Sequence, residues 1–92
     1  MKQPNNITVV AAHIARMVGG PKPTPAEWIG LDRRLKAAAQ CGETLAGVFV
    51  ELGRRHGVNG DAVGPHLQAA SRRLDVAGNS PLSSIIAARR AA

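Results

Sequence analysis

Residues 24–42 read TPAEWIGLDRRLKAAAQCG, and this stretch carries a complete set of signals for an α-helix. Thr24 can cap the helix, Pro25 suits its first position, and Glu27 is placed to close a capping box. A glycine at position 42 ends the helix. Apolar residues recur along it at helical spacing: Trp28, Leu31, Leu35 and Ala38 or Ala39. The stretch therefore predicts an amphipathic helix and assigns the chain to a helical fold.

The segments on either side show the same periodicity. Asn6 can cap a helix whose apolar stripe runs from Ile7 to Val18 and which ends at Gly19. Prolines alternate through residues 19–24, which predicts a stiff, non-helical linker. No segment alternates with the period of a strand, so no sheet is expected. Further helices are expected over about 43–56 and 65–76, and a last helix, capped by Ser80 and Pro81, is expected to run to an arginine-bearing end at Arg89 and Arg90. Residues 58–64 are expected to form a turn or a weak helical start, and the chain should break at 78–80.

These elements predict an all-α fold, a compact bundle of four to five short helices in a single domain over residues 1–92, with a frayed N-terminus at residues 1–6. A chain of this length has no room for two cores and is expected to be marginally stable. A homodimer would bury more surface, although the sequence leaves the oligomeric state open. Trp28 is expected to anchor either the core or a dimer contact.

The charge of the chain indicates an anionic partner. Twelve Lys and Arg residues stand against six acids, for a formal net charge of +6, and nine of the twelve are arginine. Arginine suits bidentate contacts with phosphate or carboxylate groups, although a GC-rich genome gives the same arginine preference without selection for binding. The single cysteine, Cys41, excludes an intrachain disulfide and is consistent with the reducing cytoplasm. The longest apolar stretch contains His13 and Arg16, which argues against a membrane span or a signal peptide.

Residues 49–68 read FVELGRRHGVNGDAVGPHLQ. This segment resembles the helix-turn-helix of phage-repressor-type DNA-binding proteins, which has a small residue in its first helix, a glycine at the turn, and apolar residues after the turn and inside the second helix. The residues that fill these positions are Gly53, Gly57, Val58, Val63 and Leu67.

The resemblance implies a DNA-binding role for particular side chains. Arg54 and Arg55 would contact phosphates, while Asn59 and Gln68 would read bases. Two residues depart from the pattern, because Pro65 would kink the second helix and Asp61 would repel phosphate. The alternative interpretation is that residues 49–68 form two ordinary helices joined by a glycine-rich turn.

Four Arg-Arg doublets occur, at positions 33/34, 54/55, 72/73 and 89/90, one in each of the last four expected helices. If the helix ends converge, Arg72 and Arg73 would join Arg54 and Arg55 in one nucleic-acid-binding face. Alternatively, the doublets complement helix dipoles and solvate the surface.

Motifs of catalysis and metal binding are absent from the sequence. It contains no phosphate-binding glycine loop with its lysine and no nucleophile elbow, so no enzymatic activity and no cofactor are expected. His56 and His66 flank the glycine turn and could meet, but no Cys or acidic residue stands at metal-ligand spacing with them, so no metal site is expected.

Together these observations predict a small basic DNA-binding regulator or accessory protein of the kind that phages and plasmids encode, which contacts duplex phosphates through arginines. The alternative is a non-enzymatic adaptor or inhibitor that binds an acidic protein.

Overall fold

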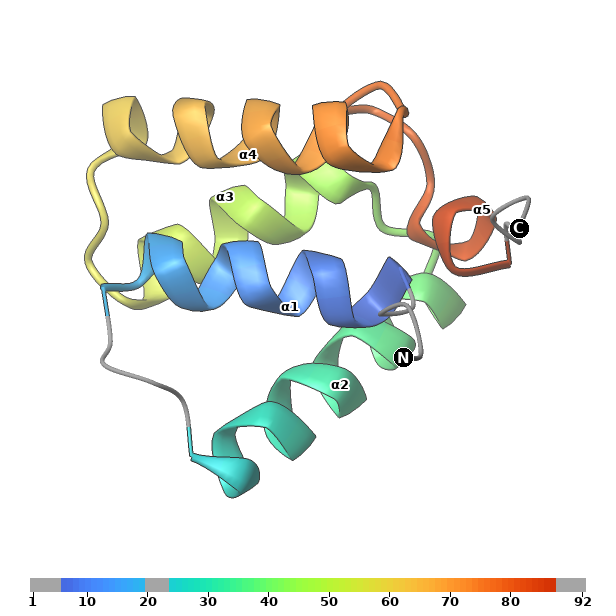
Figure 1. Ribbon diagram of the computed structural model, residues 1–92, viewed down its shortest axis with the longest axis horizontal. Helices are drawn as coiled ribbons and strands as arrows, with labels where there is room; N and C mark the ends of the chain where they lie inside the picture. The colour runs from blue at the N-terminus through green and yellow to red at the C-terminus, as the bar shows by residue number, and fades with distance from the viewer. Residues whose placement is uncertain (1–5, 20–23, 88–92) are drawn as a thin grey trace.

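A computed structural model describes residues 6–19 and 24–87 and contains five helices, drawn in Figure 1. The all-α fold is confirmed. No strand occurs in the described ranges, where the sole β-type pairing is an isolated bridge between Thr44 and Pro81. The helices are α1 (Asn6–Met17), α2 (Pro25–Gln40), α3 (Leu45–Arg55), α4 (Gly60–Leu74) and α5 (Leu82–Ala87). Among these residues, no helix is both long and apolar enough to cross a membrane.

The α1 helix lies at the centre of the bundle. It packs against each of the other four helices, with α4 above it, α2 below it and α3 behind it in the view of Figure 1. This position explains its composition, since half of its twelve residues are buried, namely Val9, Val10, Ala11, His13, Ile14 and Met17. The continuous apolar stripe of the first helix is therefore the surface on which the rest of the chain assembles.

Every helix contributes to one core. Phe49 of α3 is fully buried and is one of the largest of the core side chains. Trp28 is half-buried and packs against the edge of the core rather than filling its middle. The side chains buried most completely, apart from Phe49, are Ile14, Leu35, Leu45, Leu82, Ile85, Val10 and Val48.

The start of α2 forms as its sequence predicts. The amide of Glu27 donates to the Thr24 hydroxyl oxygen over 3.2 Å, and the amide of Thr24 donates to the Glu27 carboxylate over 3.2 Å. These two bonds make the reciprocal capping box. The helix ends at Gln40, and Gly42 follows with φ +76°, which only glycine adopts without strain.

The start of α3 is capped by a segment distant in sequence. The amides of Leu45 and Ala46 donate to the carbonyl oxygens of Ser80 and Gly78 over 3.0 and 2.8 Å, and the Thr44 hydroxyl accepts from Gly47. The first amides of a helix have no partner within it, so this external capping satisfies them. The helix consequently begins at Leu45, two residues after the expected start.

The expected start of α4 is wrong. The helix begins at Gly60 and runs through Pro65, whereas the sequence favoured a turn or weak start up to Gly64. The Asn59 side chain caps it by accepting a hydrogen bond from the amide of Asp61 over 3.1 Å. Pro65 lacks an N–H group, but the preceding Gly64 has no Cβ to clash with the proline ring. Because this clash is missing, Gly64 can adopt a helical conformation before Pro65 at a lower steric cost than other residues.

The last described helix is joined to the first. Asn6 is the first residue of α1. Its side-chain amide donates to the carbonyl oxygen of Ile85 over 2.7 Å, which connects α1 to α5. Residues 1–5 of the expected frayed N-terminus lie outside the described residues, and so do residues 20–23 of the expected linker. The Arg-Arg doublet at 89/90 also lies outside them.

Candidate nucleic-acid interface

The turn between α3 and α4 has the two glycine properties expected from the sequence. Gly53 is buried, and a Cβ built on it would lie 2.8 Å from Cγ2 of Val63 on α4. Gly57 has φ +72°, in the left-handed region. Both expectations, a small residue at 53 and a positive φ at 57, are confirmed.

The course of α4 brings its end back to the start of α3. Ala46 of α3 is hydrogen-bonded to Gly78, which lies four residues past Leu74, the last residue of α4. The helices α3 and α4 are about 16 and 22 Å long. If they crossed at a right angle, the start of α3 and the end of α4 would lie about 27 Å apart. The four residues from Leu74 to Gly78 span at most about 14 Å, so they could not bridge that distance. The two helices therefore form an antiparallel hairpin (Figure 1), whereas those of a helix-turn-helix cross at about 90–120°.

The hairpin separates the two arginine doublets that were expected to meet. Arg54 and Arg55 lie at the end of α3, next to the start of α4. Arg72 lies twelve residues further along α4 from Gly60, a distance of about 18 Å along the helix axis. The structure therefore does not bring the doublets at 54/55 and 72/73 into one patch.

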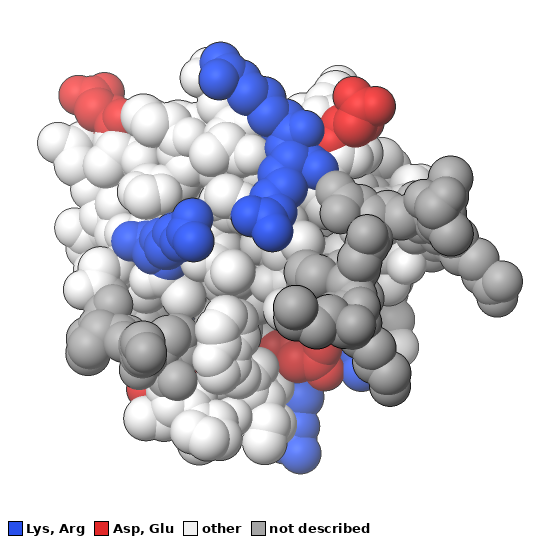
Figure 2. Space-filling model, viewed as in Figure 1, with Lys and Arg blue, Asp and Glu red and all other residues white. Residues whose placement is uncertain are grey.

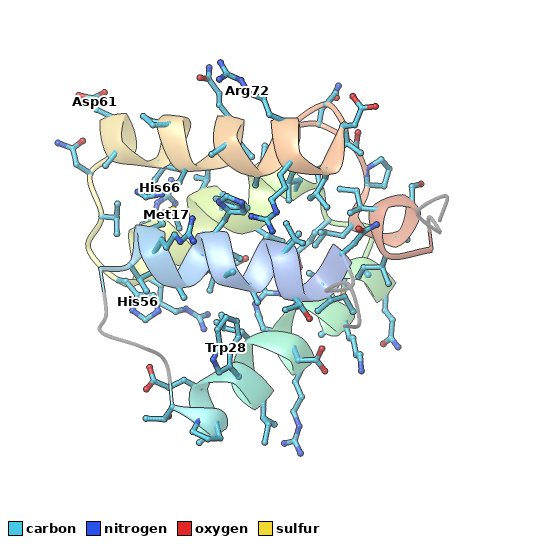
Figure 3. The ribbon with its side chains drawn as sticks, in the orientation of Figure 1. Met17, Trp28, His56, Asp61, His66 and Arg72 are labelled. Atoms are coloured by element: carbon cyan, nitrogen blue, oxygen red, sulfur yellow. The ribbon has the colours of Figure 1, made fainter. Side chains whose placement is uncertain are left out.

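The remaining predicted residues differ in what they can offer a ligand. The oxygen of Asn59 is engaged in capping α4. Gln68 and Arg72 are exposed and lie four residues apart on one side of α4, so they are neighbours. Arg72 projects away from the bundle (Figure 3). Arg55 is paired with Glu51 at 3.7 Å.

Arg34 has a structural role. Its guanidinium donates to Glu43 over 3.1 Å and to Glu51 over 2.6 Å, which joins α2 to α3 and the loop before it. These hydrogen bonds raise the pKa of Arg34, and they lower the pKa of Glu51 below its usual value. The doublet at 33/34 thus has one arginine committed to an internal ion pair.

A groove between α1 and α4 gathers cationic side chains from two helices. It has a volume of about 160 Å³ and is lined by Thr8, Val9, Ala12, His13, Arg16 and Arg73. None of these residues is acidic. Figure 2 shows basic side chains over α1 and α4, with acidic side chains at the two upper corners of this face and below α1. The groove is therefore positively charged at neutral pH.

His13 shows this positive environment directly. The ring is 7% exposed, and burial lowers its pKa, as do the nearby Arg16, Arg73 and His66 in that order. His66 lies between α4 and α1, whereas His56 lies on the other side of α1 (Figure 3). The two histidines that flank the turn therefore do not meet, and in the described ranges no three metal-ligating side chains cluster.

Sequence reasoning named Arg73 but missed Arg16 and His13 as its partners. The spacing of three residues between His13 and Arg16 places both on one edge of the α1 stripe, and that signal was available. The neighbouring position of Arg73 depends on the pairing of α1 with α4, which no local pattern specifies.

Comparison with known proteins gives no further guide to this surface, since no family model, no curated protein and no solved structure matches the chain.

Proposed function

We propose that the protein binds duplex DNA through the α1–α4 face, defined by Arg16, Arg72 and Arg73 with His13 and His66, as a small accessory or regulatory DNA-binding protein. One observation carries the proposal. Arg16 and Arg73 come from helices far apart in sequence, yet they line one groove, and none of the described residues that line it is acidic. Adjacent cations in a protein interact unfavourably, so a surface that gathers them is suited to an anion.

The chemistry of the face favours phosphate contacts over base reading. Arginine forms bidentate hydrogen bonds with phosphate oxygens, and such contacts position a protein on the duplex without specifying sequence. Gln68 is the exposed neutral polar side chain beside Arg72 on α4. In this proposal the arginines bind the phosphates of the duplex, and Gln68 is the side chain that contacts bases and gives a sequence preference.

The test is fluorescence anisotropy with a duplex of random sequence of about 20 base pairs, titrated from about 50 to about 200 mM salt. Arg16→Ala, Arg72→Ala and Arg73→Ala should each weaken binding and flatten the plot of log affinity against log salt by about one unit, because each contact releases a counterion. Gln68→Ala should change the preference among sequences with little change in this slope.

Arg33→Ala is the matched control, since Arg33 is an exposed arginine on α2 and lies in the groove between α1 and α2. It removes the same charge away from the proposed face. Parent-like affinity of the Arg16, Arg72 and Arg73 triple variant would refute the proposal.

A second candidate function rests on the groove between α1 and α2. Trp28 and Ile29 line it together with Asp32, Arg33 and Lys36, and Ile29 is 56% exposed. Asp32 pairs with Lys36 at 3.1 Å, so Arg33 leaves the rim with a net positive charge, which suits an acidic protein partner. This candidate predicts that the protein binds polyglutamate with an affinity similar to that for DNA. The double variant Arg33→Ala, Lys36→Ala should abolish polyglutamate binding, whereas substitution of the arginines of the α1–α4 face should leave it unchanged.

A further inference from the structure

We propose that the groove between α1 and α4 is a site for a single phosphate group, held by Arg16, Arg73 and the protonated ring of His13, so that phosphate binding takes up a proton. This inference rests on the proposed function, because a phosphodiester of DNA is its expected occupant. The chemistry recognised is a tetrahedral oxyanion, which free phosphate shares.

The size and lining of the groove suit an oxyanion. Its volume of about 160 Å³ is several times the share of one water molecule in the liquid, which is about 30 Å³, so an oxyanion can enter. Arginines reach it from both helices, Arg16 from α1 and Arg73 from α4. Thr8 also lines it, beside the small side chain of Ala12, which leaves room for a ligand.

His13 lies among cationic groups at this groove. The ring belongs to the buried face of α1 and yet lines the groove. The charged groups that act on it are Arg16 on its own helix and Arg73 and His66 on α4, all cationic or able to become so. None of the described residues that line the groove is acidic.

A bound anion would change the protonation of His13. Without a ligand, burial and the neighbouring cations keep His13 neutral near neutral pH, since they lower its pKa. A bound oxyanion would interact favourably with all three groups and accept a hydrogen bond from the imidazolium. Binding therefore raises the pKa of His13, and by linkage a lower pH tightens binding. One linked proton allows at most about tenfold per pH unit.

The experiment follows the histidine ring protons by NMR across pH, in chloride and in sulfate at equal ionic strength. Sulfate is the probe because its charge does not change near neutral pH, whereas inorganic phosphate titrates there. Comparison with the His13→Gln spectrum identifies the His13 signal. Sulfate should raise the pKa of His13. The His56 signal is the internal reference, since His56 lies on the other side of α1 (Figure 3).

Arg16→Gln provides a second variant that keeps the buried ring in place. It changes an exposed side chain and should remove most of the sulfate-induced shift of His13. Equal titration of His13 in chloride and sulfate would overturn the inference, and so would a shift that Arg16→Gln leaves intact.

A parallel arm measures duplex DNA binding at pH 6 and pH 8, for the parent and for His13→Gln. Tighter binding at the lower pH, lost in His13→Gln, supports both proposals. A sulfate response without DNA binding would leave the oxyanion site standing and refute the DNA proposal. DNA binding with no pH dependence and no sulfate response would refute the site alone.

Discussion

At the scale of single residues, Gly53 sets how closely α3 and α4 approach. A Cβ at this position would lie 2.8 Å from Val63 Cγ2, closer than side chains tolerate, and would also contact Met17 of α1 at 3.6 Å. Three helices therefore meet at a position that has no side chain. This packing requirement is enough to account for the small residue that made the segment resemble a DNA-binding motif.

Gly53→Ala should destabilise the protein by about 1–3 kcal/mol, because the added methyl group overpacks a filled interface. Chemical denaturation measures the change. Gly30→Ala is the matched control: Gly30 lies inside α2 with nothing within 4 Å of its added Cβ, so alanine should stabilise the protein by up to about 1 kcal/mol. Equal effects at the two positions would show that Gly53 is not a close contact.

At the scale of elements, local signals predicted helix ends where a side chain or a φ angle decides them. The Thr24 capping box and the positive φ of Gly57 are set by residues close in sequence, and both were predicted. The start of α4 was not predicted, because the proline at position 65 favoured a helix from there, whereas the Asn59 side chain caps the helix five residues earlier, at Gly60. The start of α3 was displaced because Gly78 and Ser80 supply its first hydrogen-bond acceptors, and such distant partners have no local signature.

The link between α2 and α3 gives a second stability prediction. Arg34→Ala removes the shared partner of Glu43 and Glu51 and should lower the free energy of unfolding by about 0.5–1 kcal/mol, since the pairs are partly exposed to solvent. The difference should shrink at high salt. Arg33→Ala, at the neighbouring exposed position, should have almost no effect in the same urea titration. Identical loss in both variants would contradict this role for Arg34.

At the scale of the whole molecule, the fold class followed from helical periodicity and the composition of the breaks, whereas the candidate interface did not. Arg73 was named from the sequence, but its neighbours Arg16 and His13 come from α1. Their meeting depends on which helices pair across the bundle, and the surface charge of a bundle is set by that pairing. The doublets would form one patch only if the helix ends converged, and the antiparallel hairpin instead places the doublets at 54/55 and 72/73 at opposite ends.

The pH dependence of stability follows from the same arrangement. Burial lowers the pKa of His13 from its usual 6.5, so near pH 6 the unfolded chain binds a proton that the folded chain does not. Stability should therefore fall as the pH drops below about 7, until the folded-state pKa is reached. Urea titrations at a series of pH values measure this slope. His13→Gln should flatten it, and an unchanged slope in that variant would contradict the assignment.

The central position of α1 also affects how the chain folds during synthesis. Its apolar stripe is covered by α4, whose last residue follows Met17 by more than fifty residues, so the ribosome must add all of these before the covering helix exists. At about 5–20 residues per second this takes roughly 3–10 seconds. The helix that buries the most residues is thus made before the other four described helices, and in this interval the nascent chain is most exposed to aggregation and to chaperones.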